Sequence, residues 1–129
     1  MRVLLDTHAF LWWVSGGGAK LSAAARSLIA DPSTESLFSS ASASEIATKF
    51  ASGRIVMPAR PERYIPDRLA LHGFSVLPIG LEHALRTSLL PPIHRDPWDR
   101  ILVAQAQVEG IPLVTADPAI AQYDVETIW

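Results

Sequence analysis

The sequence contains no cysteine, which excludes disulfide bonds and thiolate metal sites. This absence is compatible with a reducing cytosol, so we expect a cytoplasmic protein. Lysine is also rare, because every basic residue other than Lys20 and Lys49 is an arginine, and no basic residue follows Arg100. The formal net charge of −2 excludes a polybasic coat for nucleic acid.

Long apolar runs are also lacking. The most apolar stretch, MRVLLDTHAFLWWV at residues 1–14, is interrupted by Asp6 and His8. It is followed by a predicted glycine turn at Gly16–Gly18 rather than by a cleavage site. We therefore expect neither a signal peptide nor a membrane partner.

The 129 residues, of which 49% are hydrophobic and 19% charged, suit one compact domain spanning residues 1–129. Strand patterns alternate with helical ones, which predicts a three-layer α/β fold with a mostly parallel sheet. The predicted strands are Arg2–Asp6, Ser36–Ala41, Phe74–Ile79, Ile111–Thr115 and an edge strand at Val125–Ile128. The predicted helices are Thr7–Val14, Ser22–Asp31, Ser42–Phe50, one ending at His72, Leu81–Leu89, Asp96–Gly110 and a short one opened by Asp117.

Three local signals refine this outline. Ser42 and Glu45 have the spacing of a capping box at the start of a helix. Pro66 predicts that the helix ending at His72 is broken or starts late. Asp96 suits the N-cap of the helix that follows it, whose first position is a proline.

Five acidic residues fall where sites form in such folds, beyond the carboxyl ends of the strands. Asp6 ends the first strand, Glu45 follows the second and Asp117 follows the fourth. Asp96 and Asp99 open the helix that precedes the fourth strand. Each alone is explained by helix capping, but several carboxylates in one crevice repel each other. Bound cations are the simplest explanation for the whole set.

The donor types indicate which metal these acids suit. Oxygen ligands without cysteine or regularly spaced histidines favour Mg²⁺, with Mn²⁺ as a substitute, over zinc. His94, the nearest histidine, either contributes to substrate or metal binding or is a loop histidine without a role, and we favour the second interpretation for it and for His8. Basic residues of the middle segment form either a solvated face or a flank for a phosphate backbone. These residues are Lys49, Arg54, Arg60, Arg63 and Arg68.

Four motifs follow one another along the chain: LLDTHAFLWW, SASEIATK, HRDPWDRILVAQA and LVTADPAI. Together, from Val3 to Trp129, they resemble the PIN domain of the VapC type, the toxin nucleases of VapBC toxin–antitoxin pairs. The resemblance implies an α/β/α sandwich with a central parallel sheet. It also implies a Mg²⁺-dependent endoribonuclease, a hydrolase that uses either one ion or two.

By position, the resemblance makes Asp6, Glu45 and Asp117 the first, second and fourth metal-binding acids. The third is either Asp96 or Asp99, and alignment with the family's Leu-Ile-Ala stretch favours Asp99. The neighbouring hydroxyl groups of Thr7, Ser44 and Thr115 are expected to support the acids by hydrogen bonds.

The resemblance also implies partners. These are an RNA substrate, a second copy of the chain in a homodimer, and a VapB-like antitoxin that blocks the acidic crevice. Contact with DNA is expected only through the antitoxin.

Two alternatives compete with this interpretation. A phosphotransferase of the haloacid dehalogenase kind would use Asp6 as nucleophile, but it needs a second acid where His8 stands. A catalytically weak PIN-like module would bind RNA or a protein, with Phe10, Trp12 and Trp13 in either a partner groove or the core. Every acidic position of the family is filled here, which argues against the second alternative.

Overall fold

Five parallel strands form the centre of the computed structural model, which describes residues 1–16 and 18–129. The strand order is β3-β2-β1-β4-β5, and every neighbouring pair is parallel. The strands are β1 (Arg2–Leu5), β2 (Glu35–Ser39), β3 (Ser75–Leu77), β4 (Leu113–Val114) and β5 (Thr127–Ile128). The predicted parallel sheet and its last edge strand are therefore confirmed, although β3 and β4 are shorter than predicted.

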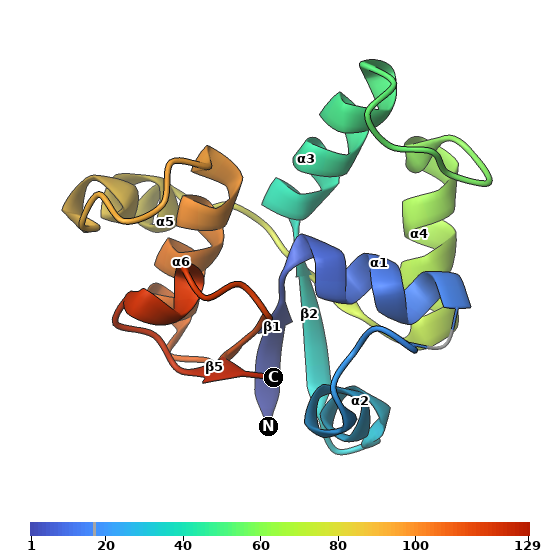
Figure 1. The fold of residues 1–129 in the computed structure, drawn as a ribbon, viewed down its shortest axis with the longest axis horizontal. Helices are drawn as coiled ribbons and strands as arrows, with labels where there is room; N and C mark the ends of the chain where they lie inside the picture. Colours follow the sequence, from blue (N-terminus) through green and yellow to red (C-terminus); the bar gives the residue numbers. More distant parts are fainter. Residues whose placement is uncertain (17) are drawn as a thin grey trace.

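Helices cover both faces of the sheet, which completes the predicted three layers (Figure 1). On one side α1, α2 and α4 pack, and on the other α6 packs with α5 against it. The remaining long helix, α3, contacts both α4 and α6. The helices are α1 (Thr7–Gly16), α2 (Ala23–Ala30), α3 (Ser40–Ala51), α4 (Pro61–His72), α5 (Leu81–Arg86) and α6 (Pro97–Glu109), with single 3-10 turns η1 (Thr87–Leu89) and η2 (Ile120–Gln122).

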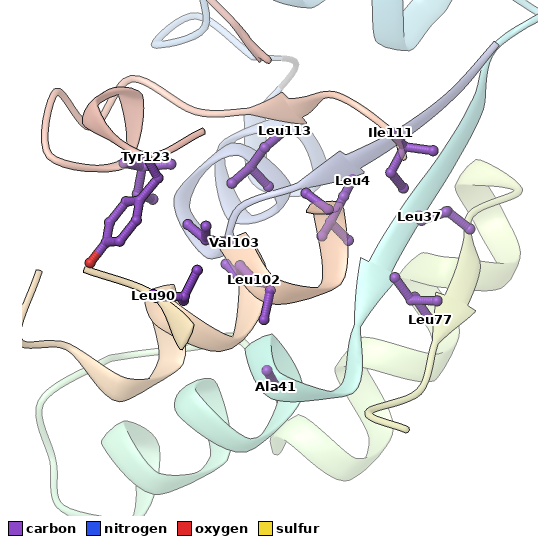
Figure 2. Close-up of a cluster of buried hydrophobic side chains, with 13 residues drawn as sticks. Leu4, Leu37, Ala41, Leu77, Leu90, Leu102, Val103, Ile111, Leu113 and Tyr123 are labelled. Atoms are coloured by element: carbon purple, nitrogen blue, oxygen red, sulfur yellow. The ribbon is translucent and has the colours of Figure 1, made fainter. Parts of the chain in front are cut away.

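The apolar run of β1 explains why the sheet has two cores. Successive side chains of a strand point to opposite faces. Leu4 packs towards α6 with Leu102 and Leu113, as Figure 2 shows, whereas Val3 and Leu5 pack on the other face. All three β1 residues are fully buried. Continuous apolar strands of this kind are typical of parallel sheets that helices cover on both sides.

The predicted capping box at Ser42 and Glu45 is wrong. Strand β2 ends at Ser39, earlier than the predicted Ala41, and the Ser39 hydroxyl caps α3 by accepting the backbone N–H of Ala41 at 2.9 Å. Ser42 therefore lies in the first turn of the helix, and Glu45 lies one turn further on. A serine-rich start offers several possible caps, and the early end of β2 selects Ser39.

The predicted break at Pro66 is also wrong, because α4 runs from Pro61 to His72 with Pro66 inside it. Pro66 is exposed, whereas the preceding Ile65 is buried in the core. Packing of the buried face holds the helix together despite the cost of about 3 kcal/mol for an interior proline.

Smaller differences concern three other segments. The predicted helix at Leu81–Leu89 tightens into η1 after Arg86, and the short helix predicted at Asp117 is the single turn η2 starting at Ile120. The predicted turn at Gly16–Gly18 includes Gly17, which lies outside the described residues. In the described part of the chain, no helix combines the length and apolar character needed to span a bilayer.

Candidate active site

Four of the predicted acids come together at the carboxyl ends of neighbouring strands. Asp6 directly follows β1, Asp117 follows β4, Glu45 lies on α3 after β2, and Asp99 lies in the first turn of α6. Figure 1 shows α1 and α3 leaving the same end of β1 and β2. The strand order β2-β1-β4 in the sheet places the segments that carry these acids side by side.

Asp6 has a structural role as well as its place among the acids. It caps α1, since Oδ1 accepts the backbone N–H of Ala9 at 2.7 Å, as the capping interpretation predicts. Its own N–H is bonded to the carbonyl of Val114 on β4 at 3.0 Å. Asp6 is 7% exposed, and burial raises the pKa of its carboxyl group, opposed by the Thr115 hydroxyl and the Ala9 N–H.

Glu45 is held by a buried network that joins α1 to α3. The Thr7 hydroxyl lies 2.8 Å from Oε1 of Glu45 and 2.9 Å from the Ser42 hydroxyl. Because Thr7 carries a single hydroxyl proton, it donates to the carboxylate and accepts from Ser42. On the other oxygen, Lys49 donates at 2.5 Å. Ser44, the expected support, is exposed, and Ser42 takes that role because α3 starts earlier than predicted.

The structure separates the roles of the paired acids Asp96 and Asp99. Asp96 is the N-cap of α6, and its Oδ1 accepts the backbone N–H of Trp98 at 2.9 Å, as predicted. Asp99 has no such capping contact, and its Oδ2 instead lies 3.1 Å from Nε2 of His94.

His94, which the sequence analysis favoured as a loop histidine without a role, contacts the acids. Its Nε2 also lies 3.0 Å from Oδ2 of Asp117, so the imidazole contacts both acids. Its Nδ1 accepts the backbone N–H of Asp96 at 3.1 Å. The sequence signal for this contact is the position of His94, two residues before the N-cap of α6. A side chain at this spacing is close to the start of the helix.

Hydrogen bonds to Tyr123 and Arg100 fix the loop that carries His94. The His94 backbone N–H donates to the hydroxyl of the buried Tyr123 at 2.7 Å, and Arg100 donates to the same oxygen at 3.2 Å. Arg100 also donates to the carbonyls of Thr87 and Pro91, both at 2.9 Å. Arg100 and Tyr123 therefore hold the imidazole in place beside the acids.

Electrostatic repulsion is concentrated on Asp99. The pKa of Asp99 is raised to about 7, chiefly by burial and in addition by the nearby carboxylates of Asp96, Glu45 and Asp6, while His94 lowers it. The acids that raise the pKa of Asp99 therefore come from three separate segments. A buried carboxyl group with a pKa this far from 3.8 beside other acids is a candidate functional residue.

The donor set suits a hard divalent cation. Among the described residues, His94, Asp99 and Asp117 have ligand atoms within 4.8 Å of one another. Asp6 and Glu45 add carboxylates whose oxygens are partly used by Ala9, Thr7 and Lys49. Clustered carboxylates with unneutralised charge fit Mg²⁺ or Mn²⁺.

The family model described as "PIN domain" matches residues 3–126, which is nearly the whole chain and includes all five acids. The chain belongs to the PIN domain family. No curated protein matches the sequence.

Solved structures share the fold of this PIN domain at low sequence identity. VapBC2 from Rickettsia felis, bound to a DNA fragment from its promoter, has a TM-score of 0.73 at 11% identity and covers 100% of this chain and 99% of its own. DNA-bound VapBC from Salmonella typhimurium gives 0.68 at 16% identity, covering 99% and 97%. A toxin–antitoxin complex from Klebsiella pneumoniae gives 0.64 at 20% identity, covering 98% and 96%. The PIN fold therefore extends over the full chain.

Proposed function

We propose that this PIN domain is the toxin of a type II toxin–antitoxin pair and acts as a Mg²⁺-dependent endoribonuclease. The observation that carries the proposal is the meeting of Asp6, Glu45, Asp99 and Asp117, from four separate segments, at one end of the sheet. The toxin role is supported by the full-length likeness to chains of VapBC complexes.

The metal would be held by these four carboxylates, with Asp96 adding negative charge from its capping position. A divalent ion in this place supplies charge neutralisation, activation of water and stabilisation of the leaving oxygen. The protein groups orient the acids: Thr7 donates to Glu45, and the Ala9 N–H donates to Asp6.

Binding of the RNA backbone is assigned to cations beside the acids. Lys49 lies next to the cluster through its contact with Glu45. Arg63 and Arg68 line a hollow of about 380 Å³ between α1 and α4. An RNA strand that runs from the acids along α3 to α4 would place its uncleaved phosphates beside these positive charges.

The activity is tested with purified protein and single-stranded RNA. Cleavage is expected with Mg²⁺ or Mn²⁺ and is expected to stop with EDTA; activity that survives complete chelation contradicts the metal mechanism. Asp6→Asn keeps the cap on α1 but removes the charge, so it should lower cleavage by about 100-fold or more without unfolding the protein. Asp124→Asn, a change at an exposed acid away from the cluster, is the matched control. A folded parent protein that binds RNA but never cleaves it supports the alternative, a catalytically weak binding module.

The antitoxin is expected to act on the same site. An arginine of its C-terminal segment would pair with Asp6, Glu45 or Asp99 and so take the place of the cation. Expression of this chain alone should slow growth, and co-expression with its antitoxin should restore it. Harmless expression of the folded, unmutated protein counts against the toxin role.

A homodimer is the remaining partner that we propose. Leu81, Leu85 and Leu89 follow one another at helical spacing along α5 and η1 and are 77%, 64% and 73% exposed. An exposed apolar stripe of this kind is typical of a protein interface. Such a stripe is self-complementary when two copies of the helix pack antiparallel.

A further inference from the structure

A hollow of about 310 Å³ lies directly beside the acids, on the α1 side of Asp6. Asp6 and Asp117 contribute its acidic edge, and α1 and the loop after β4 contribute its walls. The lining residues are Asp6, His8, Trp12, Ala116, Asp117 and Pro118. Whatever fills this hollow touches two acids of the proposed metal site.

One wall of the hollow is aromatic. His8 and Trp12 lie one turn apart on α1, and their ring centroids are 5.6 Å apart. Trp129, just after β5, supports Trp12 from a ring centroid distance of 5.8 Å and does not line the hollow. His8 is exposed and Trp12 is half-buried, so both rings keep surface for a ligand.

We propose that this hollow is a nucleobase subsite, in which one base of the RNA stacks on the His8–Trp12 wall. The proposal rests on the proposed ribonuclease function. Because Asp6 and Asp117 border the hollow, the base belongs to a nucleotide that flanks the cleaved phosphodiester bond.

The chemistry of the walls favours a base over other ligands. The described residues that line the hollow include no lysine or arginine that would pair with a phosphate. A base is uncharged, stacks on aromatic rings, and carries amino groups that donate to a carboxylate such as that of Asp117. The volume lies at the lower end of the ~300–1,000 Å³ found for small-ligand sites, which suits one base better than a peptide segment.

The test combines single-nucleotide changes in the RNA with changes in the wall. First, the bond that the parent protein cleaves in an RNA oligonucleotide is mapped in Mg²⁺. Then kcat/KM is measured on oligonucleotides that each carry one abasic nucleotide near that bond. Removal of the stacked base is expected to lower kcat/KM by about 5- to 150-fold at one position, the loss that corresponds to one base–aromatic stack.

Trp12→Leu identifies the subsite. In this variant the intact RNA should already be cleaved less efficiently by a similar factor, and the abasic nucleotide should cause no further loss, because both changes remove the same stack. Trp12→Phe keeps an aromatic ring, so removal of the base should again lower kcat/KM by most of the factor seen for the parent protein. Trp129→Leu is the matched control, in which the abasic position should still matter. His8→Ala, a change at an exposed residue, gives a second wall variant if Trp12→Leu does not fold.

Three outcomes overturn the subsite. One is that no abasic position affects cleavage. Another is that the losses from Trp12→Leu and from the abasic nucleotide multiply as independent effects. The third is that Trp12→Leu weakens antitoxin binding alone and leaves RNA cleavage unchanged, which assigns the hollow to a protein partner. If the parent protein does not cleave RNA at all, the proposed ribonuclease function fails instead, and the two failures are therefore distinguishable.

Discussion

The Nε2 atom of His94 lies 3.1 Å from Oδ2 of Asp99 and 3.0 Å from Oδ2 of Asp117. Because Nδ1 accepts the backbone N–H of Asp96, the neutral imidazole carries its proton on Nε2. A single N–H therefore points between two carboxylates that come from α6 and from the loop after β4. This contact offsets part of their mutual repulsion when no metal is bound.

The raised pKa of Asp99 predicts that metal binding depends on pH. With a pKa of about 7, Asp99 is largely protonated below that pH, and a cation must then displace the proton. Mn²⁺ affinity should rise by up to about tenfold per pH unit below pH 7 and level off above it. Calorimetric Mn²⁺ titrations at several pH values measure this, and an affinity that is flat across the range contradicts the assignment.

The same shift predicts how the stability of the metal-free protein changes with pH. The pKa of Asp99 is higher in the folded state than the ordinary 3.8, so between about 4 and 7 the folded state binds more protons than the unfolded state. The free energy of unfolding should therefore fall as pH rises through this window. In Asp99→Asn the fall should be smaller, and the remainder belongs to Asp6, whose pKa is also raised. Urea unfolding in EDTA tests this, and identical pH slopes for parent and variant contradict it.

Asp96 and Asp99 can be separated by the same conservative change. Asp96→Asn keeps an acceptor for the Trp98 N–H, so α6 should stay capped, with activity lowered by at most ~10–100-fold. Asp99→Asn removes charge where the other acids converge, and we expect it to abolish nearly all activity. Metal titration of both variants beside the parent measures the difference. An inactive Asp96→Asn that high Mn²⁺ does not rescue, next to an active Asp99→Asn, reverses the two roles.

The sequence predicted that the acids follow strands or open helices because strand ends and helix caps are local signals. Asp96, Pro97 and Gly110 bound α6 as predicted, and the apolar run of β1 correctly indicated a strand buried on both faces. The start of α3 was misjudged because Ser39 and Ser42 are equally good caps, and only the pairing of β2 with β1 decides between them.

The contacts of His94 could not be predicted in the same way. They depend on Tyr123, which is distant in sequence and accepts the His94 backbone N–H, and on Arg100, which donates to a carbonyl of the same loop. The closeness of Asp117 to His94 is likewise a consequence of β4 lying next to β1, which no local pattern encodes. Long-range contacts of this kind explain why the contacts of His94 with the acids were not predicted.

The proposed homodimer predicts the effect of a charge on the apolar stripe of α5. Leu85→Glu places a carboxylate in the middle of Leu81, Leu85 and Leu89, which should weaken self-association by tenfold or more (about 1.4 kcal/mol) without affecting the core. Leu71→Glu, at a similarly exposed leucine of α4, is the matched control. Sedimentation analysis across a concentration series measures both variants. A parent protein that stays monomeric, or an equal effect of the two changes, contradicts the assigned interface.

The proton on Nε2 of His94 predicts that this histidine orients the acids and does not bind the metal itself. Direct ligation through Nε2 would need the proton on Nδ1, where it would face the N–H of Asp96. His94→Phe removes the donor and should lower Mn²⁺ affinity by ~10–100-fold, the usual loss for a group that orients a ligand. His94→Gln offers an N–H at a similar reach and should keep most of the affinity. Zn²⁺ gives the decisive comparison, because it prefers imidazole ligands: a directly ligating His94 would make both variants lose Zn²⁺ much more than Mn²⁺, whereas an orienting His94 makes Gln tolerated for both ions.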